Sequence, residues 1–449
     1  MNFDTHSSSN SIENRDRSHI KKREYKLPTD DASVGWTVPK AFFLSQANGP
    51  LPLECGQFLP DVIVEYETYG QLNADKSNAI LITHALSGDA HVAGWDSTAS
   101  EAYRPWRLNV PGWWDALVGP GLPFDTNRFF IICSNVLGSC YGTTGPASPN
   151  PNDNNRPYGQ KFPPVTVGDW VRCERELVDF LGIDKLYAVV GGSLGGQQAL
   201  EWALATPERI GKCVMLASGA KLPAQGLGFN HVACYTILSD PNFHNGDIYG
   251  DVRVPNPLTA SAQGPDLSYY DIKKRDLTSL TAARMLAHIT YLSATGMDTK
   301  FGRRLQSVKL RQSNANANED SEEFAVHGYL QHQGQSFVNR FDANSYLTIA
   351  NAMDSYDAAA KWGGGDLVRA CSRIKADMMI GSFTSDWLYP SSESHDIVMA
   401  LMQDHHPVTS VDVQSNYGHD AFLVEEAKVQ RLLNAFLNTE APKCWRKQD

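Results

Sequence analysis

A serine flanked by glycines is the residue of this sequence best placed for nucleophilic chemistry. Ser193 lies within Gly191–Gly195, after an apolar run and before a helical pattern. A sharp strand-to-helix turn holds a serine hydroxyl clear of the backbone, and the flanking glycines let neighbouring chains approach closely. The short motif alone could arise by chance among 35 glycines. Its setting between a strand pattern and a helix pattern favours a nucleophilic serine.

Such a serine needs a base and an orienting carboxylate, because a hydroxyl is a poor nucleophile at neutral pH. In the α/β-hydrolase fold, which the serine motif indicates, the order along the chain is serine, acid, histidine. Asp386 comes just after the strand pattern at 377–383, and His419 just after the one around Val413. The interval between them has room for one helix and one strand, so both should lie at the same edge of a parallel sheet. We therefore predict a catalytic triad of Ser193, Asp386 and His419.

Other residues compete for the roles of acid and base. Asp412 is a rival carboxylate, but it lies inside the predicted last strand and not after it. His405 and His406 precede that strand and would lie at the opposite edge of the sheet. His84 and His91 would lie in a loop beside the serine, yet they come before it in the chain.

The negative charge that develops on an attacked carbonyl oxygen requires backbone N–H donors. In this fold one donor comes from the residue after the nucleophile and another from a loop after an earlier strand. Leu194 and Leu86 occupy these two positions. Backbone donors leave no side-chain pattern, so the assignment of Leu86 depends on topology, and residues 84–88 could equally form an ordinary turn.

The elements that must position these residues alternate between strand and helix. This alternation predicts an α/β fold with a mostly parallel, doubly wound sheet. The predicted strands are 61–69, 79–84, 129–133, 185–190, 213–217, 377–383 and 411–413. The first of them alternates polar and apolar residues and is expected to be half-buried. Thr166 is expected to cap a helix whose first turn holds Asp169.

The alternation lapses in the middle of the chain. Helical patterns at 225–238 and 280–294 flank a polar loop rich in Pro and Gly, and 313–323 is too polar to be packed. We predict a mostly helical lid inserted between two parts of the core. The predicted parts are a disordered polar arm at 1–38, the first part of the core at 39–220, the lid at 221–335 and the second part of the core at 336–449.

Composition excludes several classes of protein. A net charge of −11 argues against a nucleic acid or an anionic membrane as partner. No apolar run approaches the roughly 18 residues of a membrane span, and the polar start at 1–23 is unlike a signal peptide. We therefore expect a cytoplasmic protein. The eight cysteines lack metal-ligand or disulfide spacing and are expected to be reduced thiols, so no metal site is predicted.

Several motifs, taken together, resemble the homoserine O-acetyltransferase family of the α/β-hydrolase superfamily. They are 83–91, 133–146, 191–196 and 418–422, within a similarity that runs from about Pro39 to Leu437. The resemblance implies that an acetyl group passes from acetyl-CoA to the serine and then to the hydroxyl of L-homoserine, in the pathway to methionine. It implies no bound cofactor, with acetyl-CoA as a co-substrate, and a homodimer built through the lid.

The resemblance also implies the same triad and three contacts with the amino acid, from Arg284, Tyr291 and Asp420. The chemistry is consistent, since a guanidinium can bind an α-carboxylate and a carboxylate can bind an α-ammonium group. Arg284 and Tyr291 are seven residues apart, which would place them on one face of a helix.

The sequence departs from the family at several points. Leu194 stands where many relatives have Met, and Cys234 where relatives often have Arg; the N-terminal arm and the loop at 250–279 are longer than expected. Three alternatives stay open. An esterase would share the triad, and a related transferase would use succinyl-CoA or accept L-serine. A non-enzymatic binding protein would be expected to lack one of the triad residues, all of which are present.

Overall fold

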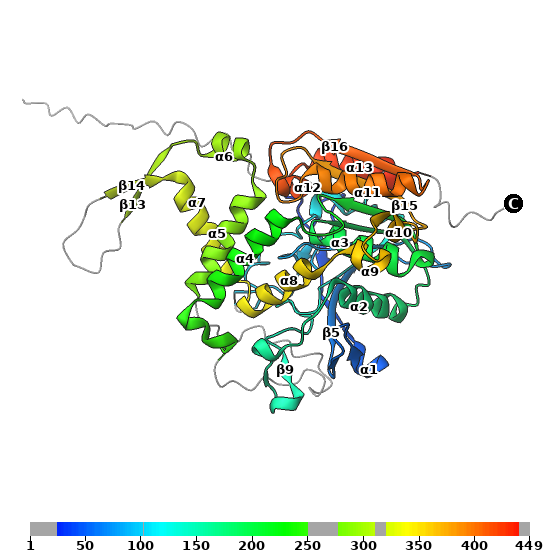
Figure 1. Cartoon of the computed structure of the whole chain (residues 1–449), viewed down its shortest axis with the longest axis horizontal. Coiled ribbons are helices and arrows are strands. Elements are labelled where there is room, and N and C mark those ends of the chain that lie inside the picture. Colours follow the sequence, from blue (N-terminus) through cyan, green and yellow to red (C-terminus); the bar gives the residue numbers. More distant parts are fainter. Residues whose placement is uncertain (1–24, 102, 250–276, 310–319, 440–449) are drawn as a thin grey trace, which may run out of the picture.

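An eight-stranded sheet forms the centre of the protein, in a computed structural model that describes residues 25–101, 103–249, 277–309 and 320–439 (Figure 1). The strands are β2 (Lys40–Phe43), β5 (Ile63–Tyr69), β6 (Ala79–Thr83), β8 (Phe130–Ser134), β11 (Leu186–Gly192), β12 (Ile210–Leu216), β15 (Asp377–Phe383) and β16 (Val408–Val413). Their order is β16-β15-β12-β11-β6-β8-β5-β2. Neighbours from β16 to β8 are parallel, and β5 is antiparallel to both β8 and β2. The prediction of a mostly parallel sheet is confirmed.

Helices cover both faces of this sheet, because its central strands carry apolar side chains on each side. Helices α2 (Val167–Phe180), α3 (Leu194–Ala205) and α11 (Ser391–Gln403) pack on one face, and α13 (Glu426–Leu437) packs on the other. The predicted cap of α2 is confirmed: the Thr166 side chain accepts from the backbone N–H of Asp169, whose carboxylate accepts from that of Thr166.

Strand β5 is buried on both faces, so the prediction of a half-buried strand is wrong. Its polar residues Glu65 and Glu67 are covered by cations from the segment after β6. The guanidinium of Arg104 pairs with the Glu65 carboxylate, and Nη1 of Arg107 lies 3.6 Å from Oε1 of Glu67. Buried carboxylates are tolerated where they are paired and hydrogen-bonded, and an alternating pattern does not reveal such partners.

Between β12 and β15 the chain forms a group of helices. These are α4 (Ala224–Leu238), α5 (Thr278–Tyr291), α6 (Ala294–Lys300), α7 (Ala325–Val338) and α8 (Ala343–Ser355). Helices α4 and α5 confirm the helical patterns predicted there. Residues 320–323, which we expected to be unpacked, belong to β14 (Asp320–Phe324), paired antiparallel with β13 (Leu305–Lys309); 313–319 lie outside the described residues. Figure 1 shows α4, α5 and α7 side by side at one end of the core.

The N-terminal segment 25–38 packs on the core, so the prediction of disorder is wrong for this part of the arm. Its strand β1 (Trp36–Thr37) pairs in parallel with β7 (Trp95–Asp96). The Lys26 ammonium donates to the Val118 carbonyl at 2.9 Å, and the Trp95 indole donates to the Lys26 carbonyl at 3.1 Å. Composition does not reveal such pairing with a distant loop. Residues 1–24 lie outside the described residues.

The remaining elements are short. They are α1 (Leu44–Asn48), β3 (Leu51–Pro52), β4 (Phe58–Leu59), β9 (Pro149–Asn150), β10 (Arg156–Pro157), α9 (Ala358–Gly363), α10 (Leu367–Cys371) and α12 (Ala421–Val424). Among the described helices, none has the length and apolar character needed to cross a bilayer.

Candidate active site

Ser193 stands at the turn between β11 and α3, in a strained conformation. Its φ of 55° and ψ of −127° fall outside the regions that residues with side chains favour. The turn is also crowded. A Cβ atom on Gly191 would lie 2.2 Å from the Gly195 carbonyl oxygen, and one on Gly195 would lie 2.1 Å from the Thr83 carbonyl oxygen. These close approaches explain why the serine is bracketed by glycines.

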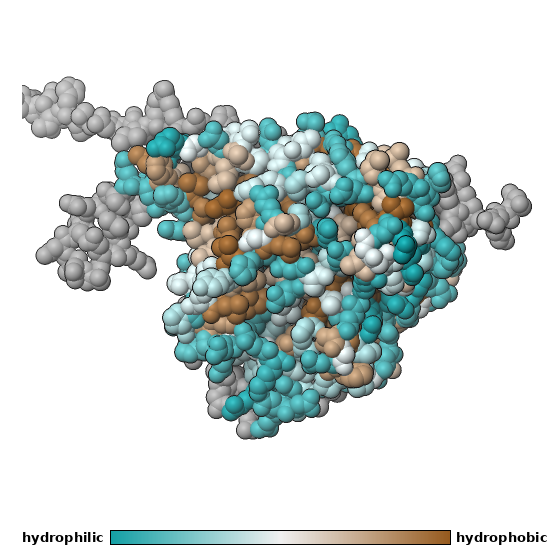
Figure 2. Space-filling view, in the orientation of Figure 1, coloured by the Kyte–Doolittle hydropathy of each residue, from teal (hydrophilic) through white to brown (hydrophobic). Residues whose placement is uncertain are grey.

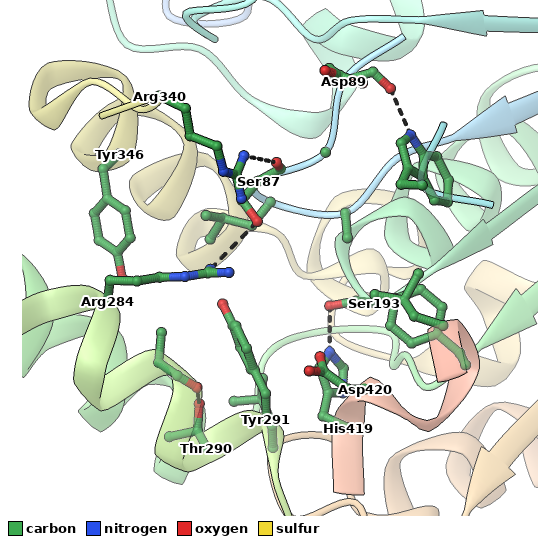
Figure 3. A pocket seen from close by; sticks show the side chains of 18 of the residues that line it. Ser87, Asp89, Ser193, Arg284, Thr290, Tyr291, Arg340, Tyr346, His419 and Asp420 are labelled. Carbon is green, nitrogen blue, oxygen red and sulfur yellow. Dashed lines mark hydrogen bonds between the residues drawn. The ribbon is translucent and has the colours of Figure 1, made fainter. Parts of the chain in front are cut away.

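The structure brings the three predicted triad residues together. The Nε2 atom of His419 lies 2.7 Å from Ser193 Oγ (Figure 3). Its Nδ1 atom lies 2.7 Å from Asp386 Oδ2. The other carboxylate oxygen of Asp386 accepts from the backbone N–H groups of Leu388 and Tyr389, each at 2.9 Å. All three side chains are buried, and the line of hydrogen bonds is suited to moving a proton from the hydroxyl to the imidazole.

The imidazole of His419 is fixed by its neighbours. The Tyr389 ring stacks on it at 5.6 Å between centroids, and Tyr291 lies on another side at 5.9 Å. The preceding Gly418 has a φ of 67°, and a Cβ atom there would lie 2.6 Å from the Tyr291 carbonyl oxygen. The end of α5 is thus in direct contact with the loop that carries the histidine.

The pKa of His419 is raised above its ordinary value of 6.5. Burial lowers it, but the charge of Asp386 and its hydrogen bond to the ring outweigh the effect of burial. A base must be neutral to accept a proton. Protonation of His419 would therefore remove the base, starting from a pH above the range of an ordinary histidine.

We expect kcat/KM to fall as the pH is lowered, with a midpoint above pH 6.5. Replacing Asp386 with asparagine removes the raising charge, so the midpoint of the residual activity should move to lower pH. The measurement is a pH profile, at constant ionic strength, of coenzyme A release from the acyl-CoA that the family resemblance implies. Asp412→Asn is the control. A wild-type midpoint well below 6.5 would contradict the assignment of His419 as base.

The rival acid and bases are held by contacts with other residues. Asp412 is paired with the half-exposed His395, with 3.0 Å between Oδ2 and Nε2. Nδ1 of His91 lies 3.1 Å from Oε1 of Glu67. His406 has its Nε2 atom 2.8 Å from the Ala376 carbonyl oxygen. None of these contacts involves Ser193.

Leu86 lies in a tight turn after β6, closed by a hydrogen bond of 2.9 Å from the Gly88 N–H to the Ala85 carbonyl. The His84 ring supports this turn, because its Nε2 atom accepts from the Val136 N–H at 3.1 Å. Leu86 lines the same cavity as Ser193, and Leu194 is the first residue of α3. The structure thus places both predicted donors at the site, and their role remains a prediction.

A cavity of about 370 Å³ opens beside Ser193 and is covered by the helices between β12 and β15. Arg284 and Tyr291, predicted to contact an amino acid, both project into it from α5, and Asp420 follows His419 on the opposite wall (Figure 3). The Arg284 guanidinium carbon lies 5.4 Å from the centre of the Tyr291 ring. The predicted residues therefore share one cavity with Ser193 and His419.

The cavity holds a cation and an anion that do not neutralise each other through a close contact. Arg284 is 8% exposed, its Nε atom has no hydrogen-bond partner, and within the described residues neither it nor Asp420 forms an ion pair. Burial lowers the pKa of Arg284 and raises that of Asp420. An amino acid, with its carboxylate and ammonium groups, would satisfy both charges.

Arg340 also lines this cavity, although nothing in the sequence predicted it. Its guanidinium donates to the Ser87 carbonyl at 3.2 Å and also to the Tyr141 hydroxyl. Arg340 lies between α7 and α8, past the end of the predicted lid, and no motif surrounds it. Tyr346 on α8 was missed for the same reason.

The order of the sheet, the serine at the β11–α3 turn, and the acid and histidine after β15 and β16 are those of α/β-hydrolase fold enzymes. A model of the α/β hydrolase fold family matches residues 78–425. No group of three or more His, Cys, Asp or Glu side chains in the described part of the chain is arranged to hold a metal ion.

Comparison with known proteins identifies the family to which the chain belongs within this class. The chain is 46% identical over 397 residues to homoserine O-succinyltransferase of Alkalilimnicola ehrlichii, covering 88% of this chain and 93% of the relative. It is 44% identical over 406 residues to the homoserine O-succinyltransferase of Pseudomonas putida strain F1, covering 90% of this chain and 97% of that relative. The chain belongs to the homoserine O-acyltransferase family of α/β-hydrolase fold proteins, which confirms the family resemblance and the predicted fold.

Solved structures give the same fold. Homoserine O-acetyltransferase from Bacillus anthracis superposes with a TM-score of 0.74 at 25% identity, covering 90% of this chain and 98% of that one. Esterase E22 superposes with a TM-score of 0.72 at 27% identity, covering 89% of this chain and 99% of the esterase. The same scaffold therefore occurs in proteins named as transferases and in proteins named as esterases.

Proposed function

We propose that this protein transfers an acyl group from an acyl-CoA to the side-chain hydroxyl of L-homoserine, through an acyl intermediate on Ser193. The observation that carries the proposal is the line of hydrogen bonds from Asp386 through His419 to Ser193, at the wall of a cavity that also holds Arg284 and Asp420. The names of the relatives support it. The product would be an activated homoserine for methionine synthesis.

In the first half-reaction His419 accepts the proton of Ser193, and the serine oxygen forms a bond to the thioester carbonyl carbon. The negative charge on the carbonyl oxygen is stabilised by the backbone N–H groups of Leu86 and Leu194. The carbon–sulfur bond then breaks, and the coenzyme A sulfur leaves with the proton held by His419. The acyl group remains as an ester on Ser193.

In the second half-reaction homoserine occupies the cavity, with its carboxylate on Arg284 and its ammonium group on Asp420. His419 accepts the proton of the homoserine hydroxyl, whose oxygen attacks the acyl carbon, and Ser193 leaves with that proton. Water competes at this step. The roof formed by α4 and α5 would exclude water while the acceptor is held close to the ester.

We propose acetyl-CoA as the donor. A succinyl group would bring a second carboxylate into the cavity, where Arg284 is required by the acceptor. Of the other arginines that line it, Arg107 is paired with Asp89 at 2.8 Å, and Arg340 is bound to a carbonyl and a hydroxyl. Apolar side chains such as Leu388 suit a methyl group. The succinyl donor is the second candidate, because relatives at 44–46% identity carry that name.

The decisive experiment measures thiol release from acetyl-CoA and from succinyl-CoA, each with L-homoserine, L-serine or no acceptor. We expect release that depends on homoserine and is fastest with acetyl-CoA, with O-acetylhomoserine identified by mass spectrometry. Faster release from succinyl-CoA would reassign the donor. Release that ignores the acceptor would instead identify a hydrolase.

We also propose a homodimer, formed through the exposed side of α4. Val232, Tyr235 and Leu238 are 53%, 64% and 54% exposed, and their spacing places them on one side of the helix. Figure 2 shows apolar side chains gathered where Figure 1 places α4 and α5. Apolar surface of this kind is typical of interfaces.

Sedimentation velocity is expected to give the mass of two chains for the wild type and of one chain for Val232→Asp. Burying a charge at the contact would cost more than the apolar contact contributes. Met402→Asp, at an exposed position on α11, is the control and should remain dimeric. A monomeric wild type would overturn the proposal.

A further inference from the structure

Arg340 links the helical lid to the loop that carries Leu86. It follows α7, and its Nη1 atom lies 3.2 Å from the carbonyl oxygen of Ser87, 253 positions earlier in the sequence. The same atom donates to the Tyr141 hydroxyl. The guanidinium carbon lies 5.2 Å from the centre of the Phe337 ring. Among the described residues Arg340 has no acidic partner in an ion pair, so its donors are directed to the protein backbone and a phenol.

The turn at 85–88 is held from two sides. At its start, the Gln198 amide donates to the His84 carbonyl at 3.0 Å, and the Gly88 N–H closes the turn on Ala85. At its end, Arg340 binds the carbonyl oxygen of Ser87. Leu86 and Ser87 occupy the two central positions of the turn. The Ser87 carbonyl shares a peptide group with the Gly88 N–H, and the Leu86 N–H shares one with the Ala85 carbonyl. The hydrogen bond from Gly88 to Ala85 joins these two peptide groups, so holding the Ser87 carbonyl also restrains the direction of the Leu86 N–H.

We infer that Arg340 is a positioning residue, which holds the Ser87 peptide group so that the Leu86 N–H is directed at the carbonyl oxygen of a substrate bonded to Ser193. This inference rests on the proposed acyl-serine chemistry, but it does not depend on the identity of the donor or of the acceptor. A guanidinium suits the task, because it is always charged and its Nη1 atom alone donates to both the Ser87 carbonyl and the Tyr141 hydroxyl.

The alternative is that Arg340 binds substrate directly, since it lines the cavity. Its contacts favour positioning. The protein already supplies acceptors for the Nη1 atom of Arg340, namely the Ser87 carbonyl and the Tyr141 hydroxyl. Arg284, by contrast, has an Nε atom without a partner and lies 3.5 Å from the hydroxyl of Ser87. The two arginines therefore differ in how much of their hydrogen-bonding capacity remains for a ligand.

The test uses p-nitrophenyl acetate, which acylates a reactive serine without coenzyme A or homoserine. For Arg340→Ala we expect kcat to fall about 10- to 100-fold with little change in KM, because a misdirected oxyanion donor destabilises the transition state more than the bound ester. Arg340→Lys should recover part of kcat, since an ammonium group can still donate to the Ser87 carbonyl. Tyr141→Phe, which leaves the charge in place, should lower kcat by a smaller factor.

Arg373→Ala is the matched control. Arg373 also donates to a backbone carbonyl, that of Leu204 at 3.0 Å, and lies over an aromatic ring, that of Trp362 at 4.6 Å, but it does not line the cavity. Its kcat should match the wild type. An unchanged ester kcat in Arg340→Ala with a raised KM for homoserine or acyl-CoA would overturn the inference in favour of direct binding.

A loss of ester kcat in Arg373→Ala equal to that in Arg340→Ala would also overturn it, because the loss would then reflect general destabilisation. If Arg340→Ala does not fold, Arg340→Lys and Tyr141→Phe still test the link. A wild-type protein that cleaves the ester but shows no homoserine-dependent thiol release would refute the proposed function while leaving this inference intact.

Discussion

Replacing Ser193 with alanine is expected to reduce acceptor-dependent release of coenzyme A by about 10⁵- to 10⁶-fold. The variant lacks the atom that forms the acyl ester, and His419 has no hydroxyl at 2.7 Å from which to accept a proton. Intact-protein mass spectrometry after mixing with acyl-CoA alone should show an acyl adduct on the wild type and none on the variant. Stopped-flow thiol release measures the rates.

A matched serine-to-alanine change controls for damage to the fold. Ser372→Ala is suitable, because its hydroxyl donates to the Arg369 carbonyl on the surface near α10. It should acylate like the wild type. An adduct of undiminished yield on Ser193→Ala would show that another nucleophile carries the acyl group, and the mechanism above would then be wrong.

Replacing Asp386 with asparagine is expected to lower kcat/KM by about 10⁴-fold. The carboxylate accepts from His419 Nδ1 at 2.7 Å, which leaves Nε2 free to accept the serine proton. An asparagine amide can present its N–H₂ group to the ring instead, and this favours the wrong tautomer of the imidazole. Steady-state thiol release measures the effect.

The fold of this variant should survive. The other carboxylate oxygen, Oδ1 of Asp386, accepts from the N–H groups of Leu388 and Tyr389, and the carbonyl of asparagine can do the same. Asp412→Asn is the control, since Asp412 is the rival carboxylate and is paired with His395. Its activity should stay near the wild-type level. Comparable losses in both variants would leave Asp386 without a distinct role.

Local patterns account for the parts of the fold that were predicted correctly. Strand β15 has the predicted bounds, 377–383, because most of its residues, among them Met378, Met379, Ile380 and Phe383, are apolar, as in a buried parallel strand. The cap at Thr166 was recognisable because its partner lies three residues away. The predictions of a disordered arm and of a half-buried β5 were wrong where distant loops pack on these segments. For example, Arg104 pairs with Glu65, 39 positions away in the sequence.

Chain order accounts for what was predicted of the site. Once the fold is recognised, the residues that follow β11, β15 and β16 must meet at one edge of the sheet, so Ser193, Asp386 and His419 could be found without coordinates. Arg340 could not, because it follows a helix whose direction across the core is set by packing and not by the order of strands.

The sequence by itself determined most strands of the central sheet, the order in which the reactive groups occur, and hence which of them share an edge of the sheet. These depend on periodicity and on chain order, which act over short distances or through a known topology. The tertiary structure alone decided the 2.7 Å contacts of His419, the cavity shared by Arg284 and Asp420, and the reach of Arg340 to Ser87. Such contacts depend on side-chain direction and close packing between segments far apart in the chain, which no local pattern records.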